Sequence, residues 1–412
     1  MLKRARLATA GRRGAIADRL LKRPDPRLSA RAINGRRRRQ HGAAAIVPML
    51  VIAAMSSCST PDAGVLIPLK SGADVSWTKT ILAVTTRRAA EKSSPGFLFS
   101  GERDNRVHFL SLTISMPPQR EPGTLPVADD HPDPKKDIAL VSSEELSYSD
   151  FIAQAKAWPS ADPVAKPRAL VFTHGYSTRF DSSVVRFAQI VEDTGFQGVP
   201  ILFSWPSRGL TAAYGYDKDS VNFSRDTMQQ LLETLTYEPA LGGVDMVAHS
   251  MGGWLTMETL RQIALSKGAK TLDRIGTVVL AAPDVDMDVF RTQVSQLGPL
   301  RSRIQIYVSQ DDRALRISRR LFGGKIRAGE NTDIVQFEEL GITAHDISGV
   351  KGGIGKNHGK AFGDDATIAG IGRTLADGTR SSPLLNGLET IVLSVPRLDN
   401  ALLSASAAAG HR

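Results

Sequence analysis

The stretch from Val244 to Gly253, VDMVAHSMGG, decides the fold of this 412-residue chain. Its first half is mostly apolar and predicts a buried strand, and a helical pattern begins at Met251 and continues to Leu265. Between them, AHSMG matches the turn G-x-S-x-G, with Ala248 in place of the first glycine. The turn is so tight that only small residues fit beside its serine, and alanine still meets that demand.

Ser250 is therefore the candidate nucleophile, because a strand–turn–helix bend raises the central hydroxyl above the sheet edge. The backbone N–H of Met251, at the start of the helix, is a candidate donor to an oxyanion. The alternative interpretation is a tight structural turn. The bare string is common by chance, but it is much more specific between an apolar strand and a helix.

Apolar strands alternate with helices on both sides of this turn. The predicted strands are Ala169–Thr173, Pro200–Phe203, Ile275–Ala282, Ile304–Val308 and Thr343–Ile347. Asp181 can cap one intervening helix, and Met228 and Leu235 belong to another with helical spacing. This alternation indicates an α/β fold, a mostly parallel, doubly wound sheet with helices on both faces. The loops after the strands then meet at one edge, where chemistry is expected.

A small strand-rich extension precedes the α/β core. Ile81–Thr85 and Val107–Met116 predict strands, six prolines between residues 117 and 134 predict loops, and Ser149–Trp158 predicts a helix.

The predicted division of the chain places one domain at 78–380. Its strand-rich part is 78–165 and its catalytic core is 166–380. A loose Ser/Ala-rich tail at 381–412 follows.

The net charge of +10 is concentrated at the N-terminus. Residues 1–57 hold 14 Lys and Arg against two acids, whereas residues 58–412 hold 38 basic and 40 acidic side chains. The body of the protein thus lacks the basic surplus of a nucleic-acid-binding domain, and we expect no nucleic-acid partner.

Residues 1–57 are predicted to be an export signal. The cluster Arg36–Arg39 precedes the apolar run Ala43–Met55, which is shorter than the ~20 residues that span a bilayer but suits a signal peptide. Cys58 follows, the only cysteine, and MSSC resembles the bacterial lipobox, whose cysteine is lipidated. We therefore expect a periplasm-facing, membrane-anchored lipoprotein with a linker over 58–77. The alternative is an uncleaved signal anchor.

The string FTHGY, residues 172–176, ends an earlier predicted strand. Gly175 lets the backbone turn back over the nucleophile, so the N–H of Tyr176 is the candidate second oxyanion donor. His174 is interpreted as a structural side chain of this loop and not as the catalytic base.

A serine hydroxyl needs a base and an orienting acid to act as a nucleophile. In folds with this strand–turn–helix bend the chain order is serine, acid, histidine. Three histidines follow Ser250. His411 lies in the tail, and His345 lies inside the predicted last strand. His358 lies in a Gly-rich loop just beyond that strand, so it is the favoured base.

The acid is expected after the strand Ile304–Val308, where Asp311 and Asp312 both qualify. Asp312 is favoured because it opens a predicted helix. A weaker alternative is the set that follows the preceding strand, which can instead cap a helix: Asp284, Asp286 and Asp288. No histidine lies near that acidic set to complete a metal site, so neither a metal nor a cofactor is expected.

At these residues the chain resembles bacterial α/β-hydrolases of the esterase/lipase superfamily, a family of unknown function. The matching strings are VFTHGY (171–176), FSWPS (203–207), YGYD (214–217), AHSMGG (248–253), LAAPDVD (280–286), SQDDRAL (309–315) and NHG (357–359), and Thr85–Arg87 also resembles the family's N-terminal region. The resemblance spans roughly residues 78–375. It implies the alpha/beta-hydrolase fold and a triad of Ser250, Asp312 and His358.

Two of these strings carry open alternatives. Trp205 either walls an acyl pocket or packs in the core, with Pro206 ending its strand. Tyr214, Tyr216 and Asp217 fit either a lid or a structural hydrogen-bond cluster.

The expected activity is hydrolysis of a carboxylic ester or thioester through an acyl-enzyme on Ser250. The substrate is expected to be a small-molecule or lipid ester, with smaller or more polar esters favoured by the 6% aromatic content. The alternatives are a non-catalytic, membrane-tethered binding module and an acyltransferase with the same triad.

Overall fold

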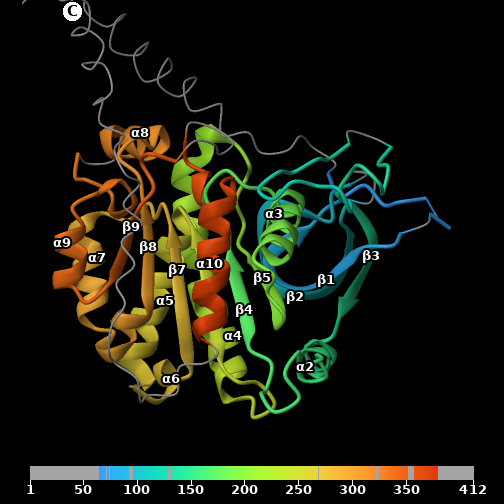
Figure 1. Cartoon of the computed structure of the whole chain (residues 1–412), viewed down its shortest axis with the longest axis horizontal. Coiled ribbons are helices and arrows are strands. Elements are labelled where there is room, and N and C mark those ends of the chain that lie inside the picture. Colours follow the sequence, from blue (N-terminus) through green and yellow to red (C-terminus); the bar gives the residue numbers. More distant parts are fainter. Residues whose placement is uncertain are drawn as a thin grey trace, which may run out of the picture. The chain divides into compact units, whose positions relative to one another are not determined.

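The computed structural model describes residues 65–70, 72–73, 75–91, 96–128, 131–267, 269–321, 324–350 and 357–378. All of them belong to one compact unit, Val51–Arg412 (Figure 1). The predicted signal, Cys58 and the predicted tail 381–412, with His411, lie outside the described residues, as do Gly352, Gly353 and Gly355.

Nine described strands form one sheet in the order β3-β2-β1-β5-β4-β6-β7-β8-β9. They are β1 (Thr78–Ala89), β2 (Phe99–Ser115), β3 (Ala139–Leu146), β4 (Ala169–Thr173), β5 (Val199–Ser204), β6 (Val244–His249), β7 (Ile275–Ala281), β8 (Ile304–Val308) and β9 (Thr343–Asp346). From β1 to β9 the neighbouring strands are parallel, whereas β1–β2 and β2–β3 are antiparallel. The predicted mostly parallel sheet is confirmed.

Helices cover both faces of the sheet. They are α2 (Tyr148–Lys156), α3 (Phe180–Asp193), α4 (Tyr214–Tyr237), α5 (Met251–Lys267), α6 (Ala269–Asp273), α7 (Met287–Ser295), α8 (Arg313–Leu321), α9 (Ile334–Glu339) and α10 (Asp365–Gly378), with 3₁₀ turns at Thr211–Ala213, Gly298–Arg303, Ala328–Glu330 and Lys360–Phe362. Among the described helices, none combines the length and apolarity needed to cross a bilayer.

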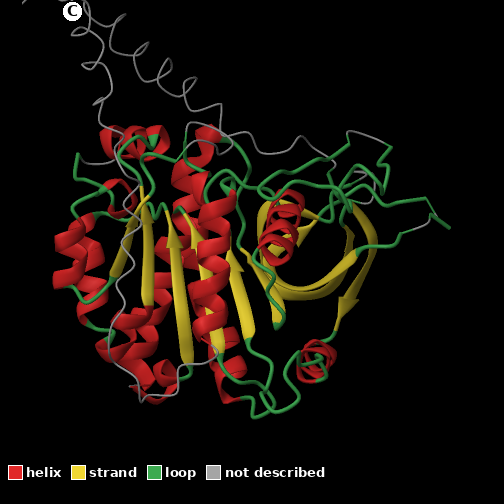
Figure 2. Ribbon diagram, in the orientation of Figure 1, coloured by secondary structure: helices red, strands yellow, loops and turns green. Residues whose placement is uncertain are grey.

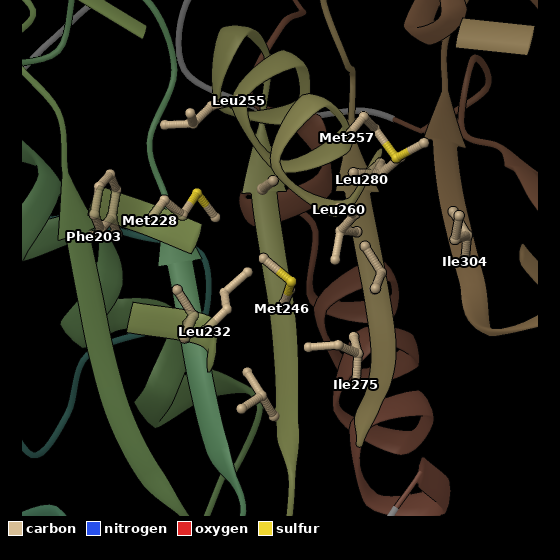
Figure 3. Close-up of a cluster of buried hydrophobic side chains, with 14 of the residues drawn as sticks. Phe203, Met228, Leu232, Met246, Leu255, Met257, Leu260, Ile275, Leu280 and Ile304 are labelled. Carbon is tan, nitrogen blue, oxygen red and sulfur yellow. The ribbon is translucent and has the colours of Figure 1, made fainter. Parts of the chain in front are cut away.

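The strands divide their side chains between two cores because successive residues point to opposite faces. On β4, Val171 packs in the cluster with α4, α5 and α7, and Phe172 packs in the cluster with α3 and α10. Figure 3 shows Met228 and Leu232 of α4 beside Phe203 and Met246 of the sheet. Strands buried on both faces account for the unbroken apolar runs in the sequence.

The N-terminal strands extend the same sheet and curl around α3 (Figure 2). Strands β1 and β2 are longer than predicted, since β1 runs from Thr78 to Ala89 and β2 from Phe99 to Ser115. Register shifts at Arg87 interrupt their pairing. The edge strand β3 was not predicted, because the middle of the strand is exposed and polar.

Helix α3 begins two residues earlier than expected. Arg179 is its N-cap, without a side-chain capping bond, and Asp181 lies in the first turn, so the predicted cap at Asp181 is wrong. The predicted helix at 149–158 is α2, capped by Ser147, whose hydroxyl accepts the N–H of Asp150.

Candidate active site

Ser250 occupies the bend between β6 and α5 in a strained conformation. Its φ is 53°, a left-handed value that non-glycine residues adopt at a cost of about 1–3 kcal/mol. The bend is held by backbone hydrogen bonds, since Ser250 N–H donates to the Ala281 carbonyl at 3.0 Å and Ser250 O accepts the N–H of Asp284 at 3.1 Å. Ser177, Ala282 and Asn357 are the other described non-glycine residues with positive φ. All four lie in loops at the same end of the strands.

Small residues let the bend approach its neighbours. A Cβ on Gly252 would lie 2.5 Å from the carbonyl oxygens of Thr173 and His174, at the end of β4. A Cβ on Gly253 would lie 2.9 Å from the Cβ of Pro283. Ala248 is fully buried, so a larger side chain has no room there. The expectation of small residues around Ser250 is confirmed.

The loop after β4 passes directly over the bend. A Cβ on Gly175 would lie 2.9 Å from both the Ser250 Cβ and the His249 Nδ1. The backbone that follows, at Tyr176, therefore lies close to the nucleophile candidate, as the sequence predicted.

His174 is a buried structural residue of this loop. Its Nδ1 lies 2.9 Å from the Gly175 carbonyl, and its Nε2 lies 3.2 Å from both Arg87 and Ser204. The ring stacks on Trp205 at 4.8 Å between centroids. Burial, reinforced by the charge of Arg87, holds the pKa of His174 well below its ordinary value, so the ring is neutral. The interpretation of His174 as structural is supported.

The buried side chain of Arg87 connects the same loop to the sheet. Its guanidinium donates to the carbonyls of Thr178 and Ser207, both at 2.8 Å, and to the Ser204 hydroxyl at 3.0 Å. Burial lowers the pKa of Arg87 to about 9, against the raising effect of Asp217, so it remains a cation at neutral pH. In the sequence only a family resemblance points to Arg87, because its partners are distant in the chain.

Asp217 completes this support. Its carboxylate accepts the Ser207 hydroxyl at 2.6 Å, the N–H of Arg208 at 3.0 Å and the N–H of Ser177 at 3.1 Å. Tyr216 packs against two guanidinium groups and donates to Glu102 at 3.2 Å. Of the two alternatives, the structural hydrogen-bond cluster therefore describes Asp217 and Tyr216.

Trp205 is fully buried in the core, and its indole N–H donates to the His174 carbonyl at 2.9 Å. It is not among the described residues that line the cavity beside Ser250. Core packing is thus the correct alternative for Trp205.

His358 and Asp312 form a close pair. The Nδ1 of His358 lies 2.6 Å from Oδ2 of Asp312, which is fully buried. The other oxygen of Asp312 accepts the N–H of Leu315 at 3.0 Å, so this carboxylate also caps α8. Both groups stand where the sequence placed them, after β8 and after β9.

The Asp312 carboxylate sets the protonation of His358. Burial alone would lower the pKa of His358, but the charge and hydrogen bond of Asp312, with a contribution from Asp284, raise it above the ordinary value of 6.5. With Nδ1–H donated to Asp312, the neutral ring keeps its lone pair on Nε2, where a base needs it.

His249 steadies the backbone of the pair. Its Nε2 lies 3.1 Å from the His358 carbonyl, and the two rings are 4.7 Å apart between centroids. Burial, followed by the charge of His358, lowers the pKa of His249 to about 3, so this ring stays neutral and donates. Sequence reasoning missed this role, because His249 occupies the variable position of the serine motif.

Asp311 has a different set of partners. Lys360 Nζ lies 2.7 and 2.8 Å from its oxygens, and the amide of Asn357 donates to it at 3.1 Å. Burial acts to raise the pKa of Asp311, but the hydrogen bonds of Lys360 and Ser309 outweigh it and hold that pKa low. Asp311 therefore ties down the segment beside His358, and Asp312 is the carboxylate that contacts the imidazole.

The remaining alternatives for the base and the acid have other partners. His345 lies on β9, stacks on Tyr307 and bonds Gln305 at 2.8 Å. Asp286 caps α7, as the sequence analysis allowed. Asp284 accepts the hydroxyl of Tyr214 at 3.0 Å and pairs with Arg327 at 3.3 Å.

Ser250 and His358 line one cavity of about 120 Å³. Its other walls include Phe172 of β4, Ser182 of α3, Leu125 of the loop between β2 and β3, and residues of α8. Within the described part of the chain, no group of three or more His, Cys, Asp or Glu side chains could hold a metal ion.

Comparison with solved structures finds esterases of low identity. An esterase from Rhizomucor miehei is 11% identical, with 84% of this chain and 93% of that chain covered and a TM-score of 0.34. Est1E from Butyrivibrio proteoclasticus is 10% identical, with 66% of this chain and 96% of that chain covered and a TM-score of 0.36. A hyperthermophilic esterase from the archaeon Pyrobaculum calidifontis is 10% identical, with 81% of this chain and 90% of that chain covered and a TM-score of 0.31. No curated protein sequence matches the chain.

The sequence itself matches a protein family over residues 156–373, more than half of the chain. That segment runs from the end of α2 into α10 and includes the bend at Ser250 and the His358–Asp312 pair. The chain therefore belongs to the family described as alpha/beta hydrolase of unknown function (DUF900).

Proposed function

We propose that the protein is a serine hydrolase that cleaves small carboxylic esters or thioesters through an acyl-enzyme on Ser250. The observation that carries the proposal is the 2.6 Å contact between His358 and Asp312 beside the cavity that Ser250 also lines. A histidine oriented by a buried carboxylate can accept a serine proton, and that combination is the chemical core of the serine triad.

The first half-reaction transfers the acyl group to the enzyme. Nε2 of His358 takes the proton from the Ser250 hydroxyl while the serine oxygen bonds to the carbonyl carbon of the substrate. Asp312 stabilises the imidazolium, and the backbone N–H groups of Met251 and Tyr176 donate to the oxyanion. The C–O or C–S bond then breaks, and the leaving alcohol or thiol receives the proton from Nε2.

The second half-reaction returns the enzyme to its starting state. His358 takes a proton from water, whose oxygen attacks the acyl carbon, and collapse of the oxyanion releases the acid and the Ser250 alkoxide, which regains the proton from Nε2. The small cavity favours short acyl groups, because about 120 Å³ is below the ~300–1,000 Å³ of pockets for drug-sized ligands.

A fluorophosphonate ester tests the nucleophile directly. We expect one covalent adduct on Ser250 in the wild-type protein and none in Ser250→Ala, together with hydrolysis of short 4-nitrophenyl esters that the variant lacks. A folded wild-type protein that takes up no phosphonate and hydrolyses no ester would leave the binding-module alternative. Product analysis with an alcohol acceptor present distinguishes hydrolysis from acyl transfer.

We also propose that the protein is held at a membrane, facing the periplasm, through a lipidated Cys58. The support comes from the sequence: an Arg cluster, a 13-residue apolar run and the sole cysteine follow one another.

A further inference from the structure

Helix α3 presents two polar side chains to the cavity beside Ser250. Ser182 and Arg186 both line it, and their i, i+4 spacing places them on one face of the helix. Neither residue has a role in the acyl-transfer steps above.

Arg186 carries a charge that no carboxylate neutralises by direct contact. Its Nη1 donates to Gln189 at 2.7 Å and to the Phe362 carbonyl at 3.3 Å, and the described residues offer no acidic oxygen within 4 Å. The nearby carboxylate of Asp193 is instead bonded to Arg120 and to the N–H of Gly123. Guanidinium N–H groups therefore remain for a ligand.

The guanidinium remains a cation in this setting. Burial lowers the pKa of Arg186 to about 10, with Asp193 opposing that effect, which is still far above neutral pH. A partly buried charge without a partner is costly, so an anion that entered the cavity would gain from pairing with it.

Ser182 supplies a second, independent sign of a ligand. Its side chain is 3% exposed, and its hydroxyl has no hydrogen-bond partner among the described residues. Buried hydroxyls are normally bonded, and a rotation of the Ser182 side chain toward the cavity that this residue lines would let an oxygen-bearing ligand provide the missing partner.

The other charged or titratable groups of the cavity are already compensated. Asp284 pairs with Arg327, and His358 pairs with Asp312. His174 and His249 are neutral for the reasons given above. Among the described cavity residues, Arg186 thus contributes the one uncompensated charge, and it is positive.

We propose that Arg186 and Ser182 form an anion subsite, so that the preferred substrate is a small ester carrying a carboxylate or phosphate group near the scissile carbonyl. The proposal rests on the proposed hydrolase function. A planar guanidinium held by Gln189 and the Phe362 carbonyl is oriented in advance to donate to such an anion.

Matched ester pairs test this substrate class. Monoethyl glutarate is compared with ethyl pentanoate, and 1-acetylglycerol 3-phosphate with 1-acetylglycerol, so that the two arms separate a carboxylate on the acyl side from a phosphate on the alcohol side. We expect the wild-type protein to prefer the anionic member of at least one pair in kcat/KM. Equal rates within both pairs would overturn the proposal.

Substitutions locate the preference on the helix. Arg186→Met should lower the anionic-to-neutral ratio of kcat/KM by about 10- to 100-fold, and Ser182→Ala by about three- to tenfold, because hydrogen bonds to charged groups are the stronger ones. Arg291→Met is the charge-matched control, since Arg291 lies on α7, pairs with Asp288 and does not line the cavity. An Arg186→Met ratio equal to that of the control would overturn the assignment.

A structural role for Arg186 makes a different prediction. Gln189 also donates to the Phe362 carbonyl, at 3.2 Å, so Gln189→Met weakens the same support without removing the charge. If Arg186 only steadied the segment of His358, both variants would lower the rates for anionic and neutral esters alike. Arg186→Lys keeps the charge, so its anionic-to-neutral ratio of kcat/KM should lie between those of the wild-type protein and Arg186→Met. This variant tests the proposal even if Arg186→Met does not fold.

Binding to an inactive variant separates this proposal from the hydrolase proposal. Ser250→Ala should bind monoethyl glutarate in calorimetry, and the additional change Arg186→Met should weaken that binding by about tenfold or more. Failure of phosphonate labelling with intact, Arg186-dependent binding would reject only the hydrolase function. Labelling at Ser250 without such binding would reject only the anion subsite.

Discussion

Oδ2 of Asp312 lies 2.6 Å from Nδ1 of His358, although 46 residues separate the two in the sequence. The contact is fixed from both sides. Asp312 accepts the N–H of Leu315 at the start of α8, and the His358 carbonyl accepts a hydrogen bond from His249. A carboxylate that already accepts a hydrogen bond at a helix N-terminus cannot readily turn away from the imidazole.

Asp312→Asn should abolish most of the activity and also move its pH dependence. Loss of a properly oriented acid costs roughly 10⁴-fold in kcat, because the imidazole is no longer held in the reactive tautomer and the imidazolium that forms has no counter-charge. The charge of Asp312 raises the pKa of His358 against burial, so that pKa should fall in the variant. The rise of residual kcat/KM with pH should then occur at lower pH than in the wild-type protein.

Asp311→Asn is the matched control for that substitution. Asp311 is held by Lys360 and does not contact the imidazole, so we expect a loss below about tenfold and an unshifted pH profile. A loss in Asp311→Asn as large as that in Asp312→Asn would mean that the acid has been assigned to the wrong carboxylate.

The wild-type rate itself should increase with pH through a midpoint above 6.5. The base must be neutral, and His358 has a raised pKa, so activity is low below that pKa and reaches its plateau above it. Measurement of kcat/KM from pH 5 to 9 with a neutral ester checks the direction. A profile that is flat over this range would exclude His358 as the base.

The sequence predicted the parts of the fold that depend on local pattern. The run Ala169–Thr173 is apolar throughout because both faces of β4 are buried, and Ser250 follows a strand at a bend that admits only small neighbours. Asp312 was favoured over Asp311 as a helix opener, and its carboxylate does cap α8.

Features that depend on distant partners could not be predicted in this way. Strand β3 pairs through its backbone at the sheet edge, and its exposed middle leaves no apolar alternation to detect. Arg87 gathers groups from the end of β5 and from two loops, so nothing near it in the sequence indicates burial. Arg186 looks like an ordinary solvent-facing helix residue until α3 is packed beside the cavity.

Arg87→Met should destabilise the protein by roughly 3 kcal/mol in the free energy of unfolding. The change leaves the carbonyls of Thr178 and Ser207, the second of them fully buried, without their donor, and it removes a cation that favours the charged form of Asp217. Urea unfolding followed by circular dichroism measures the difference. Arg88→Met is the control, because the adjacent Arg88 is exposed, and a similar loss in both variants would contradict the network role of Arg87.

Cys58→Ser should release the protein from membranes. Cys58 is the only cysteine, so a thioether-linked lipid has no other site, and mass spectrometry of the wild-type protein should find an acylated N-terminal Cys58. The variant should appear in the soluble fraction and still hydrolyse soluble esters, since residue 58 lies far from the motif residues in the sequence. Membrane retention of Cys58→Ser would favour the uncleaved signal anchor instead.

Gly175→Ala should impair catalysis much more than stability. The added Cβ would lie 2.9 Å from the Ser250 Cβ and from His249 Nδ1, so the loop must move away from the bend. That movement displaces the backbone N–H of Tyr176 from the carbonyl oxygen, and a misplacement of about 1 Å can cost about 100-fold in rate.

Gly215→Ala provides the control for that substitution. Gly215 lies in the first turn of α4, where a Cβ meets nothing within 4 Å, so the variant should keep its kcat and gain slightly in stability. The comparison isolates close approach at Gly175 from the general effect of an added methyl group. If Gly175→Ala retained full kcat with phosphonate labelling at the wild-type rate, the loop after β4 would not supply the oxyanion donor.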